Sequence, residues 1–175
     1  MMGKMNLRTI QKLTRYFLAG VLLTICQNSR AETPASFIRQ FANFKFAYHE
    51  KIQDPRVFLS SRSGDCDDFA TLADAIMRRR GYSPRLFAVR MKEETHVVCY
   101  IPETGVYLDY NYRAQENPLV SSDGSISDIA CKVADSFNSN WIAAYEFSYQ
   151  KGVKWLVNTI VVNNPVPKQI LLAGE

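Results

Sequence analysis

The sequence has few residues of the two types most often used in protein chemistry. It contains two histidines and four cysteines among 175 residues. It has no internal repeat, no low-complexity segment and no series of long apolar runs, which excludes repeat proteins and multi-span membrane proteins. Because 47% of the residues are hydrophobic and only 22% are charged, a wholly disordered chain is also excluded. One globular domain fits this length and composition.

Acidic side chains are missing from residues 1–31, which carry five basic ones. An apolar run, Tyr16–Cys26, follows most of these bases, and small residues within 29–31 suit a cleavage site. The pattern predicts a signal peptide over 1–31, export to the periplasm or medium, and no stable membrane span after cleavage. The run is shorter than the ~20 residues that span a bilayer. A permanent anchor, a lipidated Cys26 and a buried N-terminal helix are the alternatives.

Beyond residue 31 the charge is nearly balanced, with 16 basic residues against 17 acidic ones. The net charge of +4 therefore comes from the N-terminal segment. No nucleic-acid partner is expected, because binding to phosphates requires a basic surface on the folded part of the chain.

Three cysteines remain after residue 31, namely Cys66, Cys99 and Cys131. In an oxidising compartment an odd number leaves at least one thiol unpaired. We expect a Cys99–Cys131 disulfide with Cys66 free. Three reduced, buried thiols are the alternative.

Residues 32–175 are expected to form one α+β domain, with helices first and an antiparallel sheet after them. Aromatic residues at helical spacing predict a helix over 34–50, and a connecting segment follows over 51–63. The polar stretch 114–130 is expected to be a long loop before a short helix. Runs rich in β-branched and aromatic residues predict strands over 86–91, 95–100, 105–111, 143–149 and 153–162.

The best-defined helix begins after Asp65, which is a suitable N-cap residue. Asp68, three positions later, can close a capping box. Gly81 is the expected end of the helix. A single apolar stripe runs along it, formed by Phe69, Leu72, Ala73 and Ile76. Cys66 therefore lies in the first turn of this helix, where unpaired N–H groups and the helix dipole favour a thiolate.

His96 and Asp109 are predicted to meet on adjacent strands. If the two strands pair through the four-residue loop 101–104, His96 stands opposite Asp109. A register shift of two residues keeps both on one face, because strand side chains alternate with a period of two. The three residues together predict Cys66 as nucleophile, His96 as general base and acid, and Asp109 as the group that orients the imidazole. A buried cysteine and a hydrogen-bonded strand histidine are the alternative.

The stretch Arg62–Leu72, RSGDCDDFATL, resembles the Cys-helix motif of the transglutaminase-like superfamily, and more narrowly that of bacterial transglutaminase-like cysteine proteinases. Segments 78–84, 95–98 and 107–111 follow in the order typical of that family. The resemblance is clear over about residues 35–113. It implies a papain-like α+β fold with the Cys helix packed on an antiparallel sheet. It also implies thiol chemistry on an amide by the Cys66, His96 and Asp109 triad.

Three carboxylates, Asp65, Asp67 and Asp68, flank Cys66 and oppose a negative charge on its sulfur. Carboxylates on a short turn suit calcium. Some proteinases of the resembling family bind calcium at acids beside the nucleophile, and Asp65 and Asp67 match those positions. No cofactor is required, and calcium is the candidate metal. In the alternative interpretation, Asp65 and Asp68 only cap the helix.

These observations predict an exported cysteine peptidase that cleaves a protein or peptide of the cell envelope through a thioester. Two alternatives keep the same fold. In a transglutaminase, an amine resolves the thioester, and in a binding module the fold docks a cell-envelope partner without catalysis. The backbone N–H of Cys66 is the expected oxyanion donor. Gln53 is a side-chain candidate for the same role only by its residue type.

Overall fold

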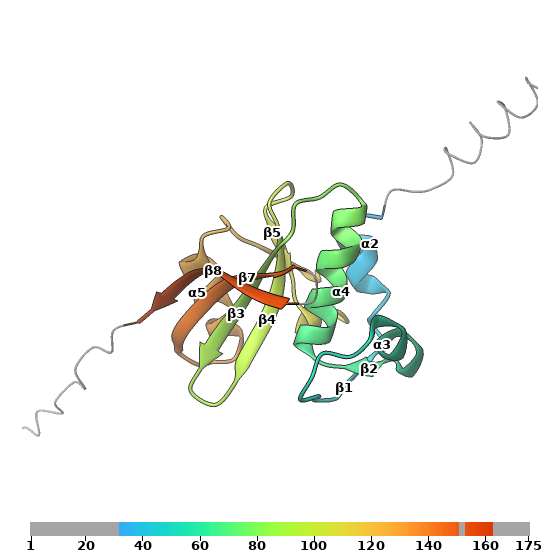
Figure 1. Ribbon diagram of the computed structural model, residues 1–175, viewed down its shortest axis with the longest axis horizontal. Coiled ribbons are helices and arrows are strands. Elements are labelled where there is room, and N and C mark those ends of the chain that lie inside the picture. The colour runs from blue at the N-terminus through green and yellow to red at the C-terminus, as the bar shows by residue number, and fades with distance from the viewer. Residues whose placement is uncertain (1–31, 151–152, 163–175) are drawn as a thin grey trace, which may run out of the picture. The chain divides into compact units, whose positions relative to one another are not determined.

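The computed structural model describes residues 32–150 and 153–162, which form an α+β fold (Figure 1). The helical segments are α2 (Pro34–Arg39), α3 (Pro55–Ser61), α4 (Cys66–Arg79), the 3-10 turn η1 (Tyr110–Tyr112) and α5 (Ile126–Ser136). The strands are β1 (Lys45–Phe46), β2 (Ser63–Gly64), β3 (Arg85–Met91), β4 (Thr95–Ile101), β5 (Val106–Leu108), β6 (Leu119–Ser121), β7 (Trp141–Gln150) and β8 (Val153–Val161). The predicted signal peptide over 1–31 lies outside the described residues. No helix within the described ranges has both the length and the apolar character to cross a membrane.

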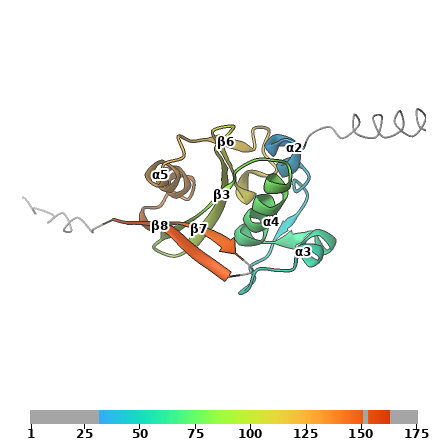
Figure 2. The same cartoon turned by 45° about the horizontal axis from the view of Figure 1, so that its top comes forward.

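A six-stranded antiparallel sheet in the order β6-β5-β4-β3-β7-β8 forms the centre of the fold. Helix α4 packs on one face and α5 on the other, and Figure 2 shows the two helices on either side of β3. Alternate residues of β3 face the two helices: Leu86 and Ala88 face α4, whereas Phe87 and Val89 face α5. The predicted α+β class, with the cysteine helix on an antiparallel sheet, is confirmed.

The α4 face is built largely from aromatic rings. Phe41 lies 5.0 Å from Phe69 and 5.7 Å from Phe58, measured between ring centroids, and all three rings are almost fully buried. Burial of each such side chain stabilises the fold by about 1.5–3 kcal/mol. Because Phe41 and Phe58 come from segments before α4, this cluster fixes the N-terminal segments against the helix that carries Cys66.

The helix predicted over 34–50 is correct only at its start, because α2 ends at Arg39. The chain then turns, and the N–H groups of Lys45 and Ala47 donate to the carbonyls of Arg62 and Gly64. This pairing of β1 with β2 removes the backbone from helical geometry despite the helical spacing of the aromatic residues.

The segment 51–63, expected to be a connection, contains the helix α3. The sequence features that start this helix are confined to its first residues. Asp54 caps the helix by accepting from the N–H of Arg56, and Pro55 occupies the first helical position.

Helix α4 forms where it was predicted. Asp65 is its N-cap, and Asp68 closes the capping box. At the other end the C-cap is Arg80, and Gly81 follows with a φ of 87°. The N–H of Tyr82 donates to the carbonyl of Met77, so the helix ends in a Schellman motif that needs the positive φ of Gly81.

The predicted Cys99–Cys131 disulfide is wrong. Cys66, Cys99 and Cys131 are all free thiols. Cys99 is buried on the α4 face of β4, whereas Cys131 is exposed on α5, which covers the opposite face. Because the sheet separates them, the two sulfurs cannot reach bonding distance. The alternative of reduced thiols fits, although only Cys99 is fully buried.

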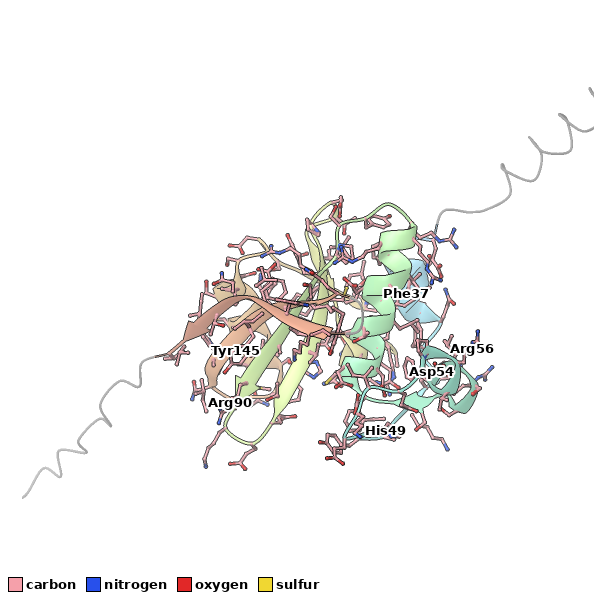
Figure 3. The ribbon with its side chains drawn as sticks, viewed as in Figure 1. Phe37, His49, Asp54, Arg56, Arg90 and Tyr145 are labelled. Atoms are coloured by element: carbon pink, nitrogen blue, oxygen red, sulfur yellow. The ribbon has the colours of Figure 1, made fainter. Side chains whose placement is uncertain are left out.

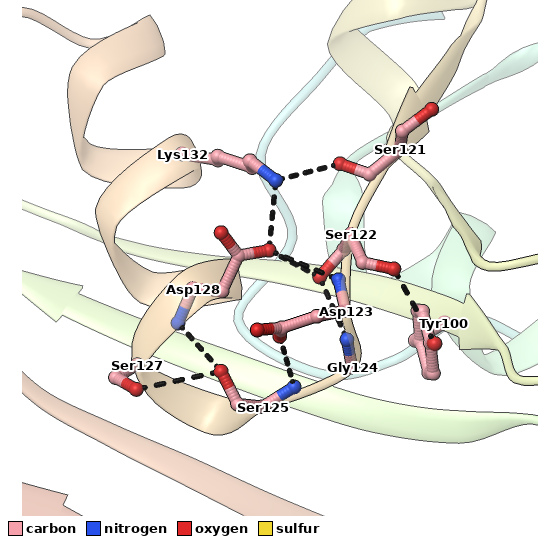
Figure 4. A network of polar contacts seen from close by, with 9 residues as sticks. All are labelled: Tyr100, Ser121, Ser122, Asp123, Gly124, Ser125, Ser127, Asp128 and Lys132. Atoms are coloured by element: carbon pink, nitrogen blue, oxygen red, sulfur yellow. Dashed lines mark hydrogen bonds and ion pairs between the residues drawn. The ribbon is translucent and has the colours of Figure 1, made fainter.

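The expected strand over 105–111 is shorter than predicted, and the expected loop over 114–130 contains β6 and the start of α5. Polar contacts hold α5 at this place (Figure 4). Ser122 Oγ donates to Asp128 Oδ2 at 2.6 Å, and Lys132 Nζ bridges the same carboxylate to the carbonyl of Ser121. The network ties the first turn of α5 to the end of β6.

Candidate active site

Cys66, at the first position of α4, lines an open cleft of about 880 Å³. The opposite wall comes from the β3–β4 hairpin and includes Arg90 and His96. His49 lines the side next to β1, and Figure 3 shows His49 and Arg90 on either side of this region. The sulfur of Cys66 is therefore both at a helix N-terminus and in a space that a substrate could enter.

His96 and Asp109 meet as the periodicity predicted. His96 Nε2 lies 2.8 Å from Asp109 Oδ1, and both side chains are buried. The strand register pairs Tyr100 with Tyr107, which differs by two residues from the predicted register, in which His96 stands opposite Asp109. A two-residue shift preserves the face, so the prediction survives the error in register.

Asp109 lies just after the end of β5 and is positioned by the following turn, not by hydrogen bonds between strands. The strand stops at Leu108, and Asp109 becomes the N-cap of η1. Its Oδ1 accepts a second hydrogen bond from the N–H of Asn111 at 2.8 Å. The other oxygen, Oδ2, is buried and has no hydrogen-bond partner. The carboxylate is thus held by the turn that ends the strand.

Cys66 and His96 line the same cleft and interact electrostatically, and His96 hydrogen-bonds to Asp109, so the structure brings the three predicted residues together. Burial alone lowers the pKa of His96. The charge and hydrogen bond of Asp109, together with Cys66, outweigh burial and raise this pKa to about 10. The imidazole is therefore protonated at neutral pH and places a positive charge next to the sulfur of Cys66.

Two of the three carboxylates around Cys66 hold the surrounding backbone. Asp68 accepts from both the backbone N–H and the side-chain amide of Gln53, each at 2.6 Å, and from the N–H of Asp65. Asp65 accepts from the N–H of His49 at 2.8 Å and from that of Asp68. The interpretation of Asp65 and Asp68 as helix-capping residues is confirmed, and they also anchor the segment that forms one wall of the cleft.

Gln53 does not face the cleft as an oxyanion donor. Its side-chain amide donates to Asp68 and to the carbonyl of Ser63. The N–H of Cys66, at the first position of α4, has no carbonyl partner within the helix and remains the expected donor.

Asp67 is the carboxylate of the three that has an unpartnered oxygen. Its Oδ1 is buried and makes no hydrogen bond. Burial, a hydrogen bond to Asp65 and the charges of Asp65 and Asp68 raise the pKa of Asp67 to about 7. Burial opposes ionisation of Asp65 as well, but hydrogen bonds from Asp67 and from backbone N–H groups lower its pKa. Of the two carboxyl groups, Asp67 is therefore the one on which a proton is favoured.

The same three carboxylates fit a hard cation. One oxygen from each of Asp65, Asp67 and Asp68 lies within 4.8 Å of the others. Asp68 already accepts three hydrogen bonds, so Asp65 and the unpartnered oxygen of Asp67 are the better ligands. A cation there would offset the negative charge of both carboxylates.

Sequence reasoning missed several residues that line the cleft. Phe137, from the end of α5, packs against His96, and Lys154, from β8, also reaches the cleft. Phe46 and Tyr48, expected on a helix, lie exposed at its rim. No local signal marks these residues, because helix and strand patterns do not specify which elements meet around a cavity.

A family model described as the transglutaminase-like superfamily matches residues 24–157. The matched range contains the cysteine helix, the sheet strands β3 to β7 and the residues Cys66, His96 and Asp109. A search of curated proteins found no match to this sequence.

Proposed function

The chain belongs to the transglutaminase-like superfamily, and from this premise we propose that it is an exported cysteine peptidase. It would cleave an amide bond in a protein or peptide of the cell envelope. Members of the superfamily are typically cysteine-dependent enzymes. The observation that carries the proposal is that Cys66 and His96 line one open cleft while His96 is hydrogen-bonded to the buried Asp109.

The first step is acylation of Cys66. Its thiolate attacks the carbonyl carbon of the substrate and forms a carbon–sulfur bond, while the carbonyl electrons move to oxygen. The backbone N–H of Cys66 donates to this oxyanion. When the intermediate collapses, the carbon–nitrogen bond breaks and the imidazolium of His96 gives its proton to the leaving amine. A thioester and a neutral imidazole remain.

The second step is hydrolysis. Neutral His96 takes a proton from water as the water oxygen attacks the thioester carbon. Collapse breaks the carbon–sulfur bond, releases the carboxylic acid and restores the thiolate beside the imidazolium. Throughout, Asp109 holds Nε2 of the ring and leaves Nδ1 as the ring nitrogen for proton transfer at the sulfur.

Asp65 and Asp67 would hold calcium in this proposal. Bound calcium would supply positive charge next to the first turn of α4, where the carboxylates otherwise oppose the thiolate. It would also favour the ionised form of Asp67, whose pKa is otherwise raised to about 7.

Alkylation of the folded protein with iodoacetamide tests the proposed thiol chemistry. Cys131 is exposed and serves as an internal control, while Cys99 is buried. We expect Cys66 to react faster than Cys131 at neutral pH, with peptide mass spectrometry as the measurement. Equal, slow labelling of Cys66 and Cys131 would support the binding module instead.

The acyl acceptor is tested separately. Activity profiling against cell-envelope proteins should yield cleaved fragments that depend on Cys66. Release of ammonia with incorporation of a labelled amine, and no new chain ends, would favour a transglutaminase. Export is tested by determining the N-terminus of the protein recovered from the periplasm, where a chain that begins at Glu32 is expected.

A further inference from the structure

The imidazole of His96 has one apolar neighbour as well as its polar partners. The ring of Phe137 lies 4.9 Å from that of His96, measured between centroids, with an angle of 60° between the planes. Phe137 is half-buried and lines the cleft, whereas His96 is only 3% exposed. Phe137 therefore packs against the buried histidine at the wall of the cleft that both residues line.

The backbone around Phe137 fixes the place of its ring. Phe137 is the C-cap of α5, and Asn138 follows with a φ of 49°. The N–H of Asn138 donates to Asp135, and that of Ser139 donates to Ala134, which closes a Schellman motif. Trp141, shortly after, begins β7 and pairs with β3. The ring is thus held from both sides by regular structure.

The hydrogen bond behind this ring is sensitive to water. Asp109 is fully buried, and its Oδ2 has no hydrogen-bond partner. A water molecule that reached Asp109 would bond to that oxygen and screen its charge from the imidazole. A ring that covers the histidine on the cleft side excludes such water at no cost in polar contacts.

We propose that Phe137 is a positioning residue for His96, and that its ring keeps the hydrogen bond between His96 and Asp109 dry. The inference rests on the proposed function of His96 and assigns to α5 a part in the site. An aromatic ring near an imidazolium also attracts the positive charge directly. Both effects favour the protonated ring that the first chemical step requires.

The direction of the effect follows from the groups around His96. Asp109 and Cys66 raise its pKa and burial lowers it. From β3 the register partner of His96 is the apolar Val89, and from α5 it meets Phe137. Removing the ring weakens both the charge effects and the burial effect. Because Asp109 and Cys66 outweigh burial in the intact site, the net change is a fall in the pKa of His96 toward its ordinary value.

A titration followed by NMR of labelled histidine tests this without any substrate. The protein has two histidines, and His49 serves as an internal reference in the same sample. We expect Phe137→Ala to lower the titration midpoint of His96 by about one unit, a tenfold change in proton affinity. Phe137→Tyr keeps the ring and should keep the midpoint.

Val133→Ala is the matched control. Val133 is buried on α5 and belongs to the core cluster against which Phe137 packs. This substitution should lower the melting temperature but leave the midpoint of His96 unchanged. If the titration midpoint of His96 moves as far in Val133→Ala as in Phe137→Ala, the shift reflects looser packing of the whole core, and the proposal is overturned. An unchanged midpoint in folded Phe137→Ala would overturn it as well.

Should Phe137→Ala fail to fold, Phe137→Leu retains apolar volume without the ring. We expect it to lower the midpoint in the same direction by a smaller amount, and no change would overturn the proposal. The pH profile of Cys66 alkylation gives a second measurement, in which the alkaline limb should shift downward in Phe137→Ala. If wild-type Cys66 proves unreactive while the midpoint of His96 still falls, the proposed function fails and the role of Phe137 stands.

Discussion

The two helices that cover the sheet contribute to the candidate site from opposite ends and with opposite chemistry. The N-cap and first turn of α4 bring a sulfur and three carboxylates, whereas the C-cap of α5 brings the phenyl ring of Phe137. His96 interacts with Cys66 and packs against Phe137. In the proposed function both contributions act on the imidazole, because charge partners act strongly only where water is excluded.

The largest effect should come from removing the group between the two helices. We expect His96→Ala to slow the alkylation of Cys66 at neutral pH by about 100-fold or more, because the imidazolium that favours the thiolate is lost. Peptide-resolved labelling rates are the measurement. Cys131, exposed on α5, should react at its wild-type rate. If Cys66 in this variant reacts at the wild-type rate, the reactivity of its thiol does not depend on His96.

The next largest effect should come from the negative charge of Asp109, which is hydrogen-bonded to the imidazole of His96. Asp109→Asn removes the charge that helps to hold the pKa of His96 at about 10. Because this pKa is raised above its unfolded value of about 6.5, the resulting stability is fully present below that pH and is lost as the pH rises toward 10. We expect the unfolding free energy of the wild-type protein to fall more steeply over this range than that of Asp109→Asn.

Denaturant titrations at several pH values measure this difference. Asp74→Asn, further along α4, is the control and should keep the wild-type slope, since Asp74 pairs with Arg78 and not with His96. Parallel curves for the wild-type protein and Asp109→Asn would contradict the coupling between Asp109 and His96.

A smaller effect, on stability, should appear at the polar end of α4. Asp68→Ala leaves three buried or half-buried N–H donors without their acceptor, including both donors of Gln53. We expect a loss of about 2–4 kcal/mol in unfolding free energy, measured by denaturant titration. Asp74→Ala removes only an exposed ion pair of the same helix and should cost about 0.3–0.5 kcal/mol.

An effect of similar or smaller size should be that of calcium. Binding at Asp65 and Asp67 should raise the melting temperature, by an amount equivalent to about 2.7 kcal/mol at a hundredfold excess over the dissociation constant. Asp67→Asn should abolish the shift, and Asp74→Asn should retain it. Isothermal titration that shows no calcium binding, with activity unchanged by a chelator, would exclude the metal.

The sequence predicted those parts of the site that rest on short-range patterns. Asp65 and Asp68 in a capping box marked the start of α4 and placed Cys66 in its first turn. Alternation of side chains placed His96 and Asp109 on one face even though the strand register was wrong by two residues. By contrast, the helical spacing of the aromatic residues around Phe41 predicted a helix that continues to residue 50. The pairing of β1 with β2 sets the backbone conformation there instead.

The sequence by itself determined the helix that carries Cys66 and the strand face that carries His96, since capping and periodicity act within a few residues. Only the tertiary structure decided that Cys99 and Cys131 lie on opposite faces of the sheet, that Gln53 bonds to Asp68, and that Phe137 covers His96. These contacts join segments far apart in the chain. They depend on how the helices pack on the two faces of the sheet, and no local pattern specifies that packing.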